Sequence, residues 1–156
     1  PDARCLLLQP GQRIADVGSG AGFPGIPLAI CEPRRNFTLI ESRAKRATFL
    51  RHVVATLALR NVVVAKSRAE DLTEEPPFDT VLARAVARPA KLLELVRPLM
   101  REGSILLLLT SSELAQSLRE PPSGFVLRPV TLKARVPSAI VALELKVASR
   151  RSGEET

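Results

Sequence analysis

Short apolar runs alternate along this chain with longer segments whose apolar residues recur at helical spacing. The runs of strand length predict strands at Arg13–Val17, Phe37–Ile40, Val62–Ala65, Phe78–Leu82, Ser104–Leu109, Phe125–Leu132 and Ile140–Val147. Helical spacing predicts helices at Phe23–Ile30, Arg43–Leu59, Lys91–Met100 and Glu113–Arg119. Strands that alternate with helices form parallel sheets through right-handed crossovers. We therefore expect an α/β fold with a mostly parallel, Rossmann-like sheet and an antiparallel C-terminal strand pair around Pro137.

Two predicted elements indicate where the core lies. In the helix at 43–59, an apolar stripe is formed by Phe49, Leu50, Val53, Val54 and Leu57. The strand Val62–Ala65 is rich in β-branched residues and is expected to be buried on both faces.

The most specific motif follows the first predicted strand. Asp16 is followed by glycines at 18, 20 and 22, and then by Phe23. Glycine has no Cβ, so the backbone can turn tightly and a ligand can approach it closely. A dinucleotide fingerprint places its third glycine five positions after the first, where this chain has Phe23. The pattern acid-x-Gly-x-Gly-x-Gly is instead typical of S-adenosylmethionine-dependent methyltransferases of class I. A glycine-rich turn without a ligand is the alternative.

Residues that follow the other strands are further candidates, because ligands of such sheets bind at the carboxyl ends of the strands. Glu41 follows the second strand and is suited to accept hydrogen bonds from ribose hydroxyls. Its alternative role is that of an acid favoured at a helix N-terminus. Ala69 and Glu70 follow the third strand, in reach of an adenine, and Arg84 and Arg88 follow the fourth.

Composition indicates one domain over residues 1–149 with a polar tail at 150–156. The net charge is +7, and 18 of the 23 basic residues are Arg. Because guanidinium groups match phosphate geometry, a polyanionic partner such as nucleic acid is one explanation, and a GC-rich coding sequence is the other. Apolar runs are too short for a membrane span, so no membrane partner is expected.

Few residues suit a metal or a redox site. Cys5 and Cys31 are far apart, and we expect both to be small buried side chains in a reducing compartment, which indicates the cytoplasm. His52 is the one histidine, so no metal site is expected. The chain is expected to be a monomer.

Basic residues also stand at the start of the helix at 43–59. Arg43, Lys45 and Arg46 lie in its first turn, where cations oppose the helix dipole. A solvated face is one explanation. Since these positions lie at the expected ligand edge, contact with phosphates is the sharper hypothesis, with Arg88 as a further contact.

The chain resembles the glucose-inhibited division protein B family of small-subunit rRNA methyltransferases. The motifs that carry the resemblance are residues 16–28 (DVGSGAGFPGIPL), 39–46 (LIESRAKR), 49–51 (FLR), 67–70 (SRAE), 77–79 (PFD) and 83–85 (ARA). The resemblance implies methyl transfer from S-adenosylmethionine to N7 of one guanine in 16S rRNA, with the rRNA or the small ribosomal subunit as partner. It also implies a cofactor site of Gly18, Phe23, Ala69, Glu70 and Arg84.

Three departures from the family pattern accompany the resemblance. The helical N-terminal segment that members usually carry is mostly lacking. Thr110-Ser111 stands where the family tends to have Lys-Gly, and Ser138-Ala139 stands where it has Arg-His. Two other functions therefore stay open: an S-adenosylmethionine enzyme with a small-molecule or protein substrate, and a non-catalytic relative that binds cofactor or RNA. A nicotinamide dehydrogenase ranks third.

Overall fold

A computed structural model describes residues 12–72, 77–84, 89–121, 123–128 and 139–146. Its helices are α1 (Gly25–Cys31), α2 (Ala44–Thr56), α3 (Pro89–Val96) and α4 (Ser112–Ser117), with 3₁₀ turns at Ala69–Asp71 and Arg97–Leu99. Its strands are β1 (Arg13–Val17), β2 (Asn36–Ile40), β3 (Val62–Ala65), β4 (Phe78–Arg84), β5 (Met100–Thr110), β6 (Phe125–Arg128) and β7 (Ala139–Leu145). Each agrees in type with the element predicted from the sequence, and β1 and β3 agree in both bounds.

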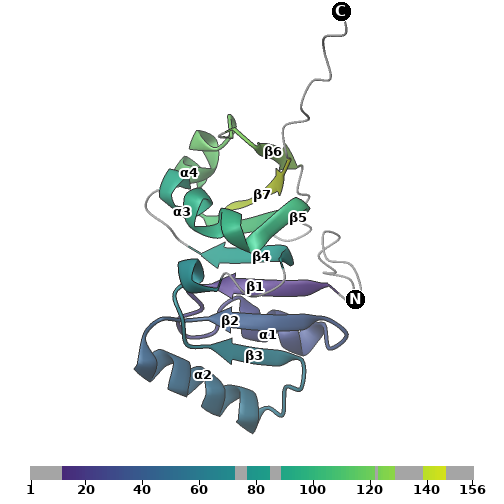
Figure 1. The fold of residues 1–156 in the computed structure, drawn as a ribbon, viewed down its shortest axis with the longest axis vertical. Helices are drawn as coiled ribbons and strands as arrows, with labels where there is room; N and C mark the ends of the chain where they lie inside the picture. Colours follow the sequence, from purple (N-terminus) through teal and green to yellow (C-terminus); the bar gives the residue numbers. More distant parts are fainter. Residues whose placement is uncertain (1–11, 73–76, 85–88, 122, 129–138, 147–156) are drawn as a thin grey trace, which may run out of the picture.

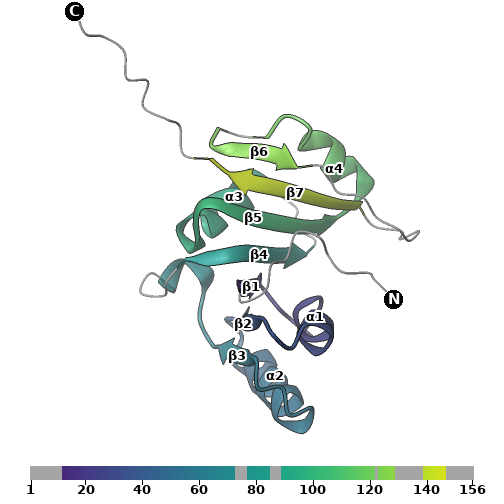
Figure 2. The ribbon, with the colours of Figure 1, turned by 90° about the vertical axis from the view of Figure 1, so that its right-hand side faces the viewer.

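The strands form one sheet in the order β3-β2-β1-β4-β5-β7-β6 (Figures 1 and 2). The pairs from β3 to β5 are parallel, whereas β7 is antiparallel to both β5 and β6. The predicted antiparallel finish is thus confirmed. β7 returns between β5 and β6, so the last strand in the chain is not the edge strand. The predicted turn around Pro137 lies outside the described residues.

Helices cover the sheet from two sides, each with its own core. Side chains of α1 and α2, such as Ile26 and Leu50, pack against Ile14, Phe37 and other residues of one sheet face. Residues of α3 and the end of α4 pack against the other face, among them Leu92, Leu93, Val96 and Leu118. Because the glycine loop follows β1 at the centre of the sheet, it is held by a core on either side.

Three expectations about burial are wrong. Phe49 and Leu57 are about half exposed, because the buried face of α2 is narrow and centres on Ala47 and Leu50. Val63 is 65% exposed, since β3 is an edge strand and only its α1/α2 side is packed. Cys31 is exposed at the end of α1, and Cys5 lies outside the described residues.

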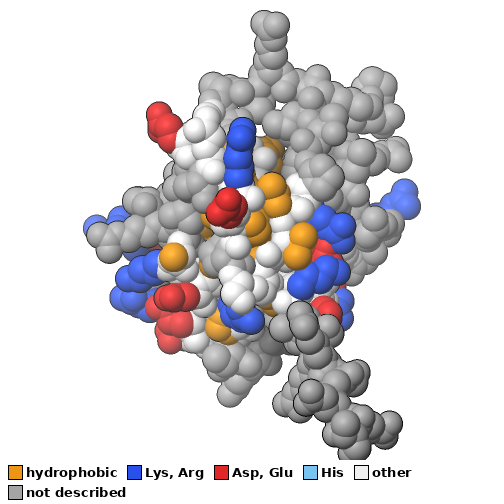
Figure 3. All heavy atoms as spheres, turned by 90° about the horizontal axis from the view of Figure 1, so that it is seen from above, with side chains coloured by type: hydrophobic (Ala, Val, Ile, Leu, Met, Phe, Trp, Pro, Cys, Tyr) orange, Lys and Arg blue, Asp and Glu red, His pale blue; other side chains and the backbone are white. Residues whose placement is uncertain are grey.

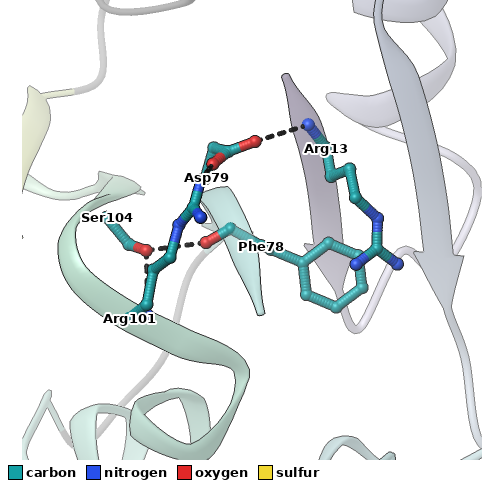
Figure 4. Close-up of polar contacts among 5 residues, drawn as sticks. All are labelled: Arg13, Phe78, Asp79, Arg101 and Ser104. Carbon is teal, nitrogen blue, oxygen red and sulfur yellow. Dashed lines mark hydrogen bonds and ion pairs between the residues drawn. The ribbon is translucent and has the colours of Figure 1, made fainter. Parts of the chain in front are cut away.

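A polar cluster joins the starts of β1, β4 and β5 at the edge opposite the glycine loop (Figure 4). Asp79 accepts a hydrogen bond from the Arg13 amide (2.9 Å) and forms an ion pair with Arg101. The Arg13 guanidinium lies 4.9 Å from the centre of the Phe78 ring. Ser104 and Asp79 help to line a hollow of about 270 Å³ at this edge. The cluster fixes the strand register and stands apart from the candidate site.

Ser104→Ala is expected to lower the free energy of unfolding by about 2 kcal/mol. The buried Ser104 hydroxyl donates to the Phe78 carbonyl (2.7 Å) and accepts from the Arg101 amide (2.9 Å), so alanine leaves both groups unpaired. Urea unfolding measures the loss, with the exposed Ser123→Ala as control. Equal stabilities of the two variants would contradict the role given to the hydroxyl.

Candidate cofactor and substrate site

The glycine loop after β1 folds back over the end of β2. Gly18, Gly20 and Gly22 have φ of 70°, 59° and 92°, in the left-handed region that favours glycine. The amides of Gly18 and Ser19 both donate to the Ile40 carbonyl (2.9 and 3.1 Å). A Cβ added at Gly18 would meet no protein atom within 4 Å. The protein therefore leaves open space above the loop, where a ligand could contact its backbone.

Asp16 supports this loop from beneath. Its side chain is 1% exposed, and its Oδ2 accepts a hydrogen bond from the Gly25 amide (3.1 Å) at the start of α1. A Cβ at Gly25 would lie 2.6 Å from that oxygen and 2.5 Å from Leu39 Cδ2, so only glycine fits there. Burial raises the pKa of Asp16 to about 6, although the Gly25 hydrogen bond, Ser19 and the charge of Arg84 lower it. Asp16 thus connects β1 to α1 inside the fold.

Glu41 links the loop to the start of α2. Its Oε2 accepts from the Gly20 amide (3.0 Å), and its Oε1 accepts from the Arg43 amide (2.8 Å). The side chain is only 5% exposed, and each carboxylate oxygen can accept a second hydrogen bond. Glu41 is therefore fixed in position with acceptor capacity left for a hydroxyl pair.

The other cofactor candidates lie at the same edge of the sheet. Phe23 follows the loop and is 55% exposed, so its ring is free to cover a ligand. Ala69 is buried at the start of the turn after β3, and the adjacent Glu70 is exposed, with a carboxylate oxygen 3.8 Å from the Arg68 guanidinium. Arg84 is exposed at the end of β4.

The structure thus brings the predicted cofactor residues to one edge because β1 to β4 are parallel and end together. Arg43, Lys45 and Arg46 stand exposed at the same edge, at the start of α2, whose first turn contains no acid. Arg88 lies outside the described residues. The sequence analysis missed Gly25 and Ser19 as supports of the loop; the signal was the glycine at the first position of a helix.

The donor set of this edge suits an adenosine-bearing ligand. Positive-φ glycines give backbone access, a fixed carboxylate matches a ribose diol, and an exposed aromatic ring matches a purine or an apolar chain. Among the described residues, no group of three or more His, Cys, Asp or Glu side chains could hold a metal ion. Within the same residues, no helix is long and apolar enough to span a membrane.

Structural comparisons show the fold of this chain in methyltransferases. An rRNA methylase from Streptococcus thermophilus superposes with a TM-score of 0.64 over 90% of each chain, at 14% identity. MtNAS in complex with S-adenosylmethionine superposes with a TM-score of 0.71 over 89% of this chain and 56% of that one, at 19% identity. At such identities the likeness concerns the fold alone. The predicted class I methyltransferase fold is confirmed.

Sequence comparisons identify the family. Ribosomal RNA small subunit methyltransferase G of Methylococcus capsulatus is 43% identical over 73% of this chain and 56% of its own length. The protein of that name from Roseiflexus castenholzii is 50% identical over 58% of this chain and 41% of its own length. The chain thus spans about half the length of these curated relatives. Residues 4–136 match the GidB family, described as rRNA small subunit methyltransferase G, and the chain belongs to that family.

Proposed function

We propose that this chain binds S-adenosylmethionine at the glycine loop and transfers its methyl group to N7 of a guanine in 16S rRNA. The observation that carries the proposal is the Glu41 carboxylate, which is held by the Gly20 and Arg43 amides beside an open glycine loop. Family membership supports the rRNA substrate. The proposal includes action as a monomer, in the cytoplasm, on rRNA or on the small ribosomal subunit.

Each candidate residue has a role in this proposal. The amides of Gly18 and Gly20 face the cofactor, while Gly22 and Asp16 keep the loop in shape. Glu41 accepts hydrogen bonds from the ribose, Ala69 and Glu70 border the adenine, and Phe23 covers the site. Arg43, Lys45, Arg46 and Arg88 contact phosphates of the RNA.

The chemistry asks little of the protein beyond alignment. Bound S-adenosylmethionine supplies an electrophilic methyl group on a positively charged sulfur. Guanine N7 carries a lone pair and no proton, so no residue of the chain has to act as a general base. The chain contributes by holding nucleophile and methyl group in line and by excluding other orientations. A cation at N7 would oppose the charge that the purine gains, so Arg84 holds the cofactor, guanine O6 or a phosphate.

The test is labelled methyl transfer to small-subunit rRNA and to particles from cells that lack this modification. Strand scission at 7-methylguanosine then locates the product. One cleaved guanine supports the proposal. A product that ribonuclease does not release supports a small-molecule or protein substrate. Cofactor binding by calorimetry without any transfer supports a non-catalytic relative.

Arg84→Ala is expected to reduce kcat by about a hundredfold, or about 2.7 kcal/mol. Arg84 is exposed at the end of β4, so its removal leaves the core and the fold intact. Single-turnover methyl transfer measures the effect, and circular dichroism checks the fold. Arg97→Ala, at an exposed position away from the glycine loop, is the control. Turnover of the Arg84 variant within threefold of the unmodified chain would remove Arg84 from the site.

A further inference from the structure

The outer face of α2 combines cations with an exposed aromatic side chain. Lys45, Phe49 and His52 are spaced i, i+4 and i+7, so they share one face of the helix, and all three are exposed. Phe49 has half of its surface in solvent. The buried residues of α2, Ala47 and Leu50, lie on the opposite side. This face is therefore directed away from the sheet.

Basic residues continue along the whole length of this helix. Residues 42–61 include Arg43, Lys45, Arg46, Arg51 and Arg60, without any Asp or Glu. Of these, Arg43, Lys45, Arg46 and Arg60 pair with no carboxylate among the described residues. Within α2, the cations stand in the first turn, which the helix dipole disfavours, and the last turn has none. Helix stability therefore does not explain the placement of these charges.

The far end of α2 lies beside a second basic segment. Asn61 donates through Nδ2 to the carbonyls of Ala29, Glu32 and Arg35 (3.0, 3.3 and 3.1 Å). These contacts hold the exposed Arg60 close to the exposed Arg34. The helix has 13 residues and is about 20 Å long. Cations thus stand at both ends of a face that is long enough to follow several phosphates.

The opposite end of the molecule has a different charge pattern. Figure 3 looks down on the β6 end, where acidic and basic side chains are interspersed. There Glu144 pairs with both Arg128 and Lys146. The net positive charge is therefore concentrated around α2 rather than spread evenly, and charge complementarity selects a polyanion for this face.

We propose that the outer face of α2 binds the shallow minor groove of an RNA helix that flanks the target nucleotide. Arg43, Lys45 and Arg46 contact the backbone at the cofactor edge, and Arg34 and Arg60 contact it at the far end. Between them, Phe49 packs on riboses and His52 hydrogen-bonds to 2′-hydroxyls, which this groove displays. The inference deepens the proposed function and names a double-stranded element as part of the substrate.

Binding of a labelled RNA hairpin, and of a DNA hairpin of the same sequence, tests this surface by fluorescence anisotropy. Phe49→Ala is expected to weaken RNA binding about tenfold. His52→Ala is expected to reduce the preference for RNA over DNA, since the 2′-hydroxyl distinguishes the two. Arg60→Ala is expected to lower the slope of log K against log salt by about 0.9, as for the loss of one phosphate contact.

Arg119→Ala removes the same charge from an exposed position at the α4 end and serves as the matched control, with affinity within twofold of the unmodified chain. Phe49, His52 and Arg60 variants that bind RNA as tightly as this control would overturn the inference. Equal affinity of the unmodified chain for RNA and DNA hairpins would also overturn it. Calorimetry with S-adenosylmethionine and the methyl-transfer assay separate the two proposals. Weakened RNA binding without any methyl transfer would support the α2 surface and reject the proposed function.

Discussion

Glu41→Ala is expected to weaken the binding of S-adenosylmethionine by about a thousandfold, or about 4 kcal/mol. The carboxylate accepts hydrogen bonds from the amides of Gly20 and Arg43, and charge-assisted bonds of this kind contribute about 1.5–3 kcal/mol each. Alanine leaves both amides without their partner and removes the acceptor proposed for the ribose. Isothermal calorimetry with S-adenosylmethionine and with S-adenosylhomocysteine measures the loss.

Two further variants separate the site from general effects of charge. Glu41→Gln keeps one acceptor oxygen but presents an NH₂ group to one of the two amides, so its affinity is expected to lie between those of the unmodified chain and Glu41→Ala. Glu94→Ala removes an exposed carboxylate from α3 and is expected to bind as the unmodified chain does. Affinity of Glu41→Ala within threefold of this control would show that the carboxylate is no part of the cofactor site.

The local elements could be predicted from the sequence because each has a clear pattern. The strands Arg13–Val17 and Val62–Ala65 are bounded by turn residues, and the structure has them at those positions. The order of the strands could not be predicted, because it depends on pairing between distant segments. Nothing in the residues of β7 indicates that this strand returns between β5 and β6.

The candidate site could be predicted as far as the strand ends define it. Since the strands are parallel, residues after β1, β2 and β4 had to lie at one edge. The sequence could not show that the Asp16 side chain is enclosed beneath the loop, because burial depends on Gly25 and Leu39 approaching it. Nor could it show that Phe49 is exposed. A periodic apolar stripe gives the direction of the buried face, but its width depends on what packs against it.

The buried carboxyl of Asp16 is expected to make folding stability pH-dependent. Burial raises its pKa to about 6, against an ordinary value of 3.8, so the folded state binds this proton more tightly than the unfolded chain does. The stability that the proton contributes is complete below about pH 4 and is lost as the pH rises through about 6. At 1.36 kcal/mol per pKa unit, the whole effect is about 3 kcal/mol, and about half of it falls between pH 5 and pH 8.

Asp16→Asn is expected to remove this dependence, because an amide keeps an acceptor oxygen for the Gly25 amide and does not titrate. Relative to the unmodified chain, the variant should gain about 1.5 kcal/mol in unfolding free energy between pH 5 and pH 8. Urea unfolding at both pH values measures the difference. Asp71→Asn makes the same substitution at an exposed position and is expected to follow the unmodified chain. Parallel pH profiles for Asp16→Asn and the unmodified chain would mean that the loop holds this carboxyl in contact with water, and its role as a buried link between β1 and α1 would be wrong.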